Sequence, residues 1–145
     1  PGSPLTHSSE SPGVMRSILG TGPAVGAEIS QTVPTNARWL LVSIMNTLVT
    51  DGTAANREVV LLYDDGTSVY LRIPSNFTHV ANLSRIYSWQ LDATRFTPAQ
   101  STVLNIRLPR TTIMGGHRVR TLTVNFQATD AWAIPILLVE EWIED

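Results

Sequence analysis

Carboxylate side chains are the first candidates for chemistry in this sequence. Two of them facing each other across a cleft would supply the acid and base of a glycosidase. Loop oxygens of Asp51, Asp64 and Asp65 would instead suit calcium. These three residues and Asp130 all lie in predicted turns, where an Asp side chain commonly accepts hydrogen bonds from nearby backbone. Turn formation is the favoured interpretation, and no catalytic residue is predicted.

Histidine and cysteine indicate no further site. His7, His79 and His117 lie far apart, and no two have the i, i+2 or i, i+4 spacing of metal ligands. Cysteine is absent, which excludes a disulfide, a thiolate metal site and a cysteine nucleophile. No nucleophile-elbow, phosphate-loop or dinucleotide-binding motif is present. The sequence therefore predicts a protein that is not an enzyme and that holds neither a metal nor a cofactor.

Charge in this chain is sparse and unevenly placed. Charged residues make up 15% of the sequence and all ten basic residues are Arg, whereas about 25% charged residues is usual. A surface with few charges is often covered by another molecule. The only basic cluster consists of Arg107, Arg110, Arg118 and Arg120. Two interpretations of this cluster are open: its arginines lie on a solvent-facing strand, or they form a salt-bridge surface between subunits.

Length and net charge limit the classes of partner. A chain of 145 residues is one domain with room for a proper core. The net charge of −2 gives no electrostatic footprint for nucleic acid. No stretch reaches 18 uninterrupted apolar residues, and no signal-peptide pattern is present. We therefore expect neither nucleic acid nor membrane as a partner.

Strands are the elements that must position these residues. The central one is predicted within Asn36–Gly52, a long apolar run rich in β-branched residues that we expect to be buried on both faces. Turn residues recur every 8–15 residues, and the Asp65-Gly66 pair predicts a hairpin. The other predicted strands are Val25–Val33, Arg57–Tyr63, Ser68–Ile73 (ended by Pro74), Leu83–Leu91, Val103–Leu108, His117–Gln127 and Ile134–Ile143. The predicted fold is an all-β antiparallel β-sandwich, jelly-roll-like, with an extended N-terminal arm.

The first 23 residues differ from the rest and are predicted to form that arm, before a β-sandwich domain at residues 24–145. The segment is rich in Pro, Gly and Ser and has no strand or helix period. Ordering it costs roughly 23–46 kcal/mol. Burial of its apolar side chains returns only about 8–15 kcal/mol. We therefore expect neighbouring subunits to hold the arm in place. Its apolar residues are Leu5, Val14, Met15, Ile18 and Leu19.

Four motifs of the domain carry a resemblance to known proteins. They are Val33-Pro34-Thr35-Asn36-Ala37-Arg38-Trp39, Leu48-Val49-Thr50-Asp51-Gly52 with Ala55-Asn56-Arg57, Asp65-Gly66, and Leu138-Val139-Glu140-Glu141-Trp142-Ile143. With these motifs the domain resembles a family of small phage virion proteins encoded among head and tail genes. The resemblance covers roughly Ile29 to Glu144, and none of its motifs is catalytic. The chain is more generally similar to capsid decoration, or cement, proteins, which implies a compact β domain, often trimeric, whose arm clamps neighbouring subunits.

Together these observations predict a phage structural protein that stabilises the head. Its expected partners are further copies of itself, as a trimer, and the major capsid protein or other virion proteins. Its expected location is the capsid surface, after synthesis in the host cytoplasm. The interface is predicted to involve Leu5, Val14, Met15, Ile18, Leu19, Arg107, Arg110, Arg118, Arg120 and Trp142.

Two alternatives stay open at this point. One is a tail or baseplate adaptor, which predicts a ring symmetry other than three-fold. The other is a carbohydrate-binding or receptor-binding module on the same fold. That module requires exposed aromatic side chains along a groove, and the candidates are Tyr63, Tyr70, Trp89 and Trp132.

Overall fold

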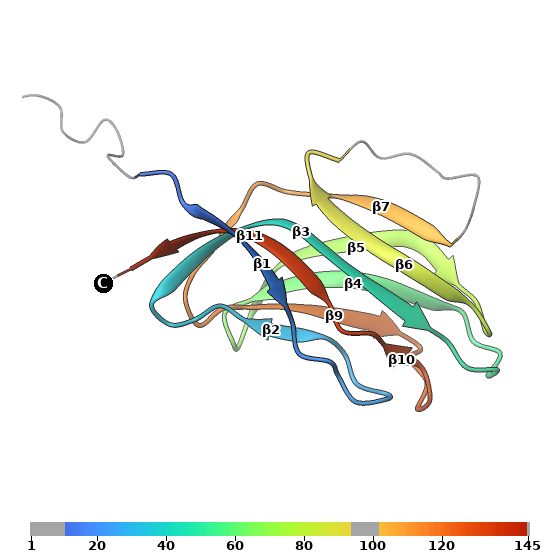
Figure 1. Cartoon of the computed structure of the whole chain (residues 1–145). Helices are drawn as coiled ribbons and strands as arrows, with labels where there is room; N and C mark the ends of the chain where they lie inside the picture. Colours follow the sequence, from blue (N-terminus) through green and yellow to red (C-terminus); the bar gives the residue numbers. More distant parts are fainter. Residues whose placement is uncertain (1–10, 94–101, 145) are drawn as a thin grey trace, which may run out of the picture.

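The computed structural model describes residues 11–93 and 102–144 of the chain. In this part of the chain the backbone forms strands and no helix, and the strands make two sheets (Figure 1). The strands are β1 (Val14–Leu19), β2 (Ser30–Thr32), β3 (Ala37–Val49), β4 (Arg57–Asp64), β5 (Val69–His79), β6 (Ser84–Leu91), β7 (Val103–Leu108), β8 (Thr112–Ile113), β9 (Arg118–Val124), β10 (Ala131–Trp132) and β11 (Ile136–Ile143).

The first sheet is built around β3. Its strands follow the order β1-β11-β3-β6-β7, and the short β8 and β10 also pair with β3. Along one edge, β3 pairs first with β11 and then with β10. Along its other edge, it pairs first with β8 and then with β6. The prediction of a central strand in this stretch is therefore confirmed.

The second sheet has the order β2-β9-β4-β5. The predicted hairpin at Asp65-Gly66 connects β4 to β5, and Gly66 has a φ of 97°, which favours glycine. Carboxylate oxygens stabilise this turn, because Asp64 accepts a hydrogen bond from the Gly66 N–H and Asp65 accepts one from Thr67 N–H. The turn chemistry expected of these Asp residues is present.

The strand pairs are antiparallel with one exception. β6 and β7 pair in parallel, from Ile86 opposite Val103 to Leu91 opposite Leu108. The wholly antiparallel arrangement that we predicted is therefore wrong at this pair. The two strands are separated in sequence by residues 92–102.

The core lies between the two sheets. Side chains from both sheets contribute to it, and three of the four Trp residues are among them. Trp89 is fully buried, and Trp39 and Trp132 are 3% and 4% exposed. The Tyr87 ring stacks on Trp89 with centroids 5.6 Å apart and meets Trp132 edge-on. Three of the four Trp residues therefore belong to the core.

Glu28 connects the two sheets by hydrogen bonds. One of its oxygens accepts from the Trp132 indole of the first sheet at 3.1 Å and from the Thr121 and Thr123 hydroxyls of the second at 2.8 and 2.9 Å. Its other oxygen accepts the Thr123 N–H. These bonds explain why β9 turns its threonines, and not its Leu122, toward the interior.

Two strands differ most from their predicted extents, while β9 and β11 are shorter than predicted by a few residues. β5 continues through Pro74 to His79, because it is an edge strand in which a missing N–H need not break a ladder. The first predicted strand, Val25–Val33, contracts to β2, although Ile29 and Val33 are still fully buried on either side of it.

Burial on both faces of β3 was also expected, and it is wrong for the second half of the strand. The inward side chains are covered throughout, as expected. On the other face Met45 is 43% exposed and Val49 48% exposed. No described element lies over that face, and this exposure defines the candidate site.

Candidate interaction surface

The outer face of the first sheet carries a continuous band of small and apolar side chains. Strand registers place Leu19 beside Ile136, Ile136 beside Met45, and Met45 beside Ser88. Because side chains alternate between faces along each strand, the outward residues follow from these pairs. We name this set the outer face: Met15, Ser17, Leu19, Ser43, Met45, Thr47, Val49, Ser84, Ile86, Ser88, Val103, Ile136 and Leu138.

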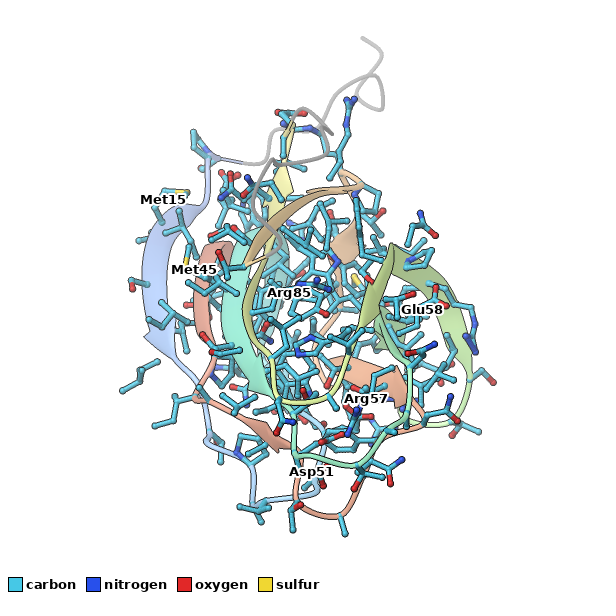
Figure 2. All side chains as sticks on the ribbon, turned by 90° about the vertical axis from the view of Figure 1, so that its right-hand side faces the viewer. Met15, Met45, Asp51, Arg57, Glu58 and Arg85 are labelled. Carbon is cyan, nitrogen blue, oxygen red and sulfur yellow. The ribbon has the colours of Figure 1, made fainter. Side chains whose placement is uncertain are left out.

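Exposure of the outer face is high for apolar side chains. Leu19 is 71% exposed, Met15 52%, Ile136 51% and Met45 43%. Figure 2 shows Met15 and Met45 on the same side of the molecule, away from Glu58 of the second sheet. The exposed apolar area is on the order of 500 Å², toward the upper end of the largest patch on an ordinary monomer.

No charged side chain lies within the outer face. Charges appear only at its borders. Glu140 accepts the Gly13 N–H at 2.9 Å and Arg38 pairs with Glu144 at 3.0 Å. On the β7 side, the exposed Arg107 points the same way as Val103. The Arg38 guanidinium also stacks on Trp142, 4.6 Å from the ring centroid. The outer face itself therefore offers apolar surface and no charged group for contact.

β1 extends the outer face and is held by its own chain. Its six residues pair with β11, from Val14 opposite Glu141 to Leu19 opposite Ile136. Arg16 donates to Glu141 at 2.7 Å, and Trp142 donates its indole N–H to the Ser11 carbonyl oxygen. This contact differs from the expectation for the arm, in which neighbouring subunits supply all the contacts. The sequence did not reveal this strand because β1 is held by backbone pairing to β11, which requires no alternation of apolar residues.

Glu141 is the buried anchor beneath β1. Its side chain is 6% exposed and accepts hydrogen bonds from the Trp39 indole at 2.8 Å and from Arg16. Burial alone would raise the pKa of this carboxyl, but the hydrogen bonds from Trp39 and Arg16 outweigh it and leave the pKa below its ordinary value. Glu141 is therefore charged at neutral pH and fixes the position of β1.

The predicted interface residues fall into several places. Val14, Met15 and Leu19 are exposed on β1, Ile18 packs partly against the core, and Trp142 lies on the outward side of β11. Leu5 lies outside the described residues. The structure thus brings five of the six apolar candidates to one sheet. There Leu19 lies opposite Ile136, which in turn lies opposite Met45, and the sequence singled out neither of these two residues.

The four basic candidates separate from one another. Arg118 and Arg120 both donate to Asp64, whose side chain is only 1% exposed. Burial alone would raise the pKa of Asp64, but the hydrogen bonds from the two guanidinium groups outweigh this effect and lower the pKa to about 2. These arginines serve their own chain. Arg110 pairs with Asp92 at 3.3 Å, and Arg107 stands apart on β7.

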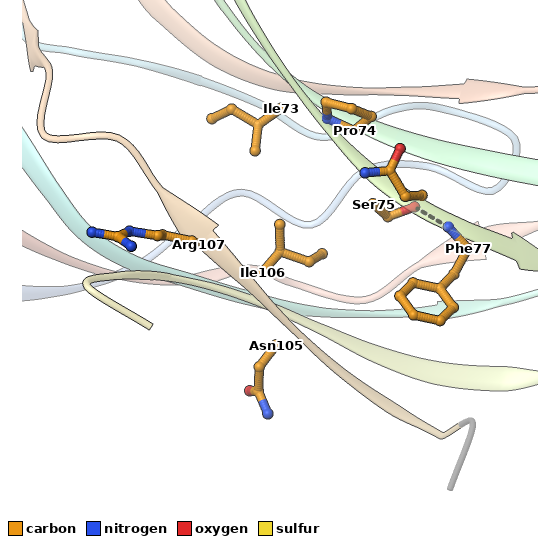
Figure 3. Close-up of a pocket in the computed structure, with 8 residues that line it drawn as sticks. Ile73, Pro74, Ser75, Phe77, Asn105, Ile106 and Arg107 are labelled. Carbon is orange, nitrogen blue, oxygen red and sulfur yellow. Dashed lines mark hydrogen bonds between the residues drawn. The ribbon is translucent and has the colours of Figure 1, made fainter. Parts of the chain in front are cut away.

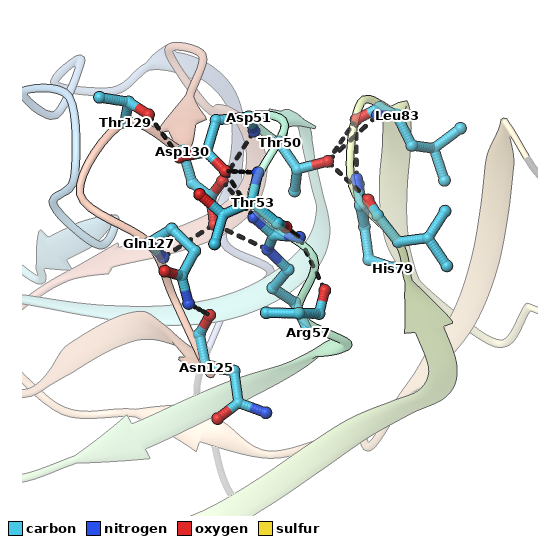
Figure 4. A network of polar contacts seen from close by, with 12 residues as sticks. Thr50, Asp51, Thr53, Arg57, His79, Leu83, Asn125, Gln127, Thr129 and Asp130 are labelled. Carbon is cyan, nitrogen blue, oxygen red and sulfur yellow. Dashed lines mark hydrogen bonds and ion pairs between the residues drawn. The ribbon is translucent and has the colours of Figure 1, made fainter.

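The other two predicted turn aspartates meet at one buried arginine (Figure 4). Arg57 is fully buried and donates to both oxygens of Asp130, at 2.9 and 3.0 Å, and to Asp51 at 2.8 Å. A hydrogen bond from Thr129, with further ones from Thr53, lowers the pKa of Asp51 to about 2. Both carboxylates are therefore held by hydrogen bonds to one guanidinium, as parts of a structural network. The network ties the loop after β3 to the loop before β10.

The histidines show no common site. The His79 Nε2 donates to the Leu83 carbonyl oxygen at 2.8 Å, so Nδ1 accepts from the Tyr87 hydroxyl at 2.9 Å. His117 contacts the Tyr70 hydroxyl at 3.1 Å, and His7 lies outside the described residues. Within the described ranges no three His, Cys, Asp or Glu side chains are grouped as metal ligands would be.

The aromatic residues required by the carbohydrate-binding alternative are mostly inside. Tyr63 and Trp89 are fully buried, Trp132 is 4% exposed, and only Tyr70 is exposed, at 44%. The exposure predicted for the other three is therefore wrong. They belong to the core, and they line no groove.

Comparisons with known proteins identify no relative. No protein-family model matches the chain, and no curated protein matches it. In the part of the chain that the structure describes, no helix is long and apolar enough to cross a membrane.

Proposed function

We propose that this protein is a structural protein of a phage particle, a capsid decoration protein that acts by association alone. The observation that carries the proposal is the outer face, an apolar and charge-free surface on a domain in which only 15% of residues are charged. The resemblance of the Ile29–Glu144 region to small phage virion proteins supports the same assignment. The all-β domain with its two sheets agrees with it, and we propose the β-sandwich of jelly-roll type for that domain.

Sister copies of this chain are the proposed occupants of the outer face. A surface without charge meets no like-charge repulsion when it contacts a copy of itself. The exposed apolar band, on the order of 500 Å², would supply the larger part of the roughly 800 Å² per partner that stable interfaces use. We propose a trimer in which the outer face contacts neighbouring subunits.

The arm has a narrower role in this proposal than its length suggests. β1 belongs to its own sheet, so the proposed contact with an adjacent subunit or the capsid shell is assigned to residues 1–12. A deletion that tests this contact should therefore stop before Gly13. Removing all 23 residues would also strip the outer edge of the first sheet.

Co-sedimentation with phage heads tests the proposed function. The full-length protein, Met45→Glu and a variant lacking residues 1–12 are each mixed with heads of the phage whose genome carries the gene. We expect the full-length protein to bind at a fixed number of copies per capsid subunit, and both variants to bind less. Absence of saturable binding by the full-length protein would contradict the assignment to the head.

A further inference from the structure

A groove runs between the free edges of the two sheets, on the side away from β1. β5 ends the second sheet and β7 ends the first. Two hollows of about 180 and 400 Å³ lie between them, and both are lined by Ile73 and Arg107 (Figure 3). The buried Ile73, Ile106 and Leu108 contribute apolar surface to it. This groove is separate from the outer face and does not depend on the proposed function.

The backbone of β7 offers a strand edge to this groove. β7 pairs with β6 along its whole length, and no described strand pairs with its other side. An unpaired edge presents N–H and C=O groups that another extended chain can use. A segment added there would extend the first sheet by one strand.

β5, across the groove, is shaped differently. Its register against β4 jumps between Glu58 and Val60, so that Ser75, Asn76 and Phe77 bulge out, and Asn76 has a φ of 61°. Pro74 adds a position without an N–H. A bulge and a proline are the usual protections of an edge against strand pairing. β5 therefore forms a wall of the groove, and β7 is the edge open to pairing.

Charge indicates the chemistry of the occupant. Arg72 and Arg107 both line the larger hollow, and both are exposed. Within residues 11–93 and 102–144 neither contacts a carboxylate, whereas Arg16, Arg38, Arg57, Arg110, Arg118 and Arg120 all do. The registers place Arg72 on the outward side of β5 and Arg107 on the outward side of β7, so they flank the groove from its two walls.

We propose that this groove binds an extended, carboxylate-bearing peptide segment of another protein, which adds as a strand to β7. Alternate side chains of that segment enter the apolar groove and pack near Ile73, Phe77 and Ile106. Its carboxylates bind Arg72 and Arg107, whose planar guanidinium groups suit paired hydrogen bonds to carboxylate.

Peptide titration with NMR detection on the isotope-labelled full-length chain tests the proposal. The probe is an acetylated, amidated peptide of sequence Thr-Val-Glu-Val-Asp-Val-Thr. Two matched peptides carry Gln and Asn in place of the acids, or N-methyl groups on alternate amides. We expect shifts in β5 and β7 with the first peptide only. Arg72→Gln and Arg107→Gln should each weaken binding about tenfold, while Arg110→Gln, whose partner is Asp92, should leave it unchanged.

The contrary outcomes are distinct. Equal binding of the acidic and the amide peptide would overturn the role of the two arginines. Equal binding of the N-methylated peptide would overturn strand addition to β7. No binding of the acidic peptide at millimolar concentration, or shifts confined to the outer face, would overturn the proposal as a whole.

Discussion

Arg57 and Asp130 form a two-point ion pair in which neither side chain reaches solvent. The Nε and Nη2 atoms of Arg57 lie 3.0 and 2.9 Å from the two carboxylate oxygens of Asp130, and both side chains are 0% exposed. Asp130 also accepts the backbone N–H groups of Asp51 and Gln127. One buried pair therefore joins the β3–β4 connection and the β9–β10 connection to the start of β4 at this end of the molecule.

Removal of one member of that pair should be strongly destabilising. Asp130→Ala leaves Arg57 charged and buried, and we expect a loss of about 3–5 kcal/mol in the free energy of unfolding. Urea denaturation measures it. The double variant Arg57→Met with Asp130→Ala should lose less than the two single variants combined, because neither member of the fully buried pair is then left without the other. Strict additivity would show that the pair is not coupled.

The pKa of Asp64 predicts a stability change in acid. The folded-state pKa of about 2 lies below the ordinary 3.8, so the carboxylate stabilises the folded chain above pH 4, and this contribution is lost as the pH falls toward 2. The contribution amounts to about 2 kcal/mol. The free energies of unfolding of the wild type and of Asp64→Asn should therefore differ at pH 7 and converge as the pH approaches 2. A constant difference would contradict the pairing with Arg118 and Arg120.

His79 predicts a second pH dependence, near neutrality. Burial lowers its pKa below the ordinary 6.5, with the charges of Arg85 and Arg57 acting in the same direction. The neutral ring is the stabilising form, so stability is complete above pH 6.5 and falls as the pH drops through the lowered folded pKa. His79→Gln should reduce the loss of stability between pH 7.5 and pH 5.5 in urea denaturation. An unchanged loss would show that other groups cause it.

Gly13 is predicted to control the attachment of β1. A Cβ at this position would lie 2.6 Å from Glu140 Cγ and 3.0 Å from the Glu141 carbonyl oxygen. Gly13→Ala should therefore loosen β1, with amide exchange from Val14 to Leu19 about tenfold faster. Gly52→Ala is the matched control, since its nearest atom would be 3.5 Å away. Equal exchange in both variants would contradict the role of Gly13.

Strands with a strong pattern could be predicted from the sequence, and those without one could not. The long apolar run of β3 and the Asp65-Gly66 turn are local signals, and both are present in the structure. β8 and β10 have two residues each and carry no period. The inward placement of Thr121 depends on Glu28, which lies 93 residues away in the chain.

The candidate surface depends on information that a single sequence does not contain. An apolar run such as that in β3 predicts two covered faces, and only the arrangement of the other strands shows that none covers Met45. The outcome for the basic cluster could not be predicted for a similar reason. Arg118 and Arg120 bind the buried carboxylate of Asp64, because the strand register places Asp64 opposite Arg118.

The molecular mass in solution tests the central claim about the outer face most directly. Light scattering is applied to the wild type, to Met45→Glu, and to Val124→Glu, a residue of similar exposure, 46%, on the second sheet. We predict about three times the 15.9 kDa of one chain for the wild type and Val124→Glu, and a single chain for Met45→Glu. A mass of two chains that falls to one chain in Met45→Glu would support the outer face as an interface and contradict the trimer. The proposed interface would be contradicted if the wild type had the mass of a single chain, or if Met45→Glu had the same mass as the wild type.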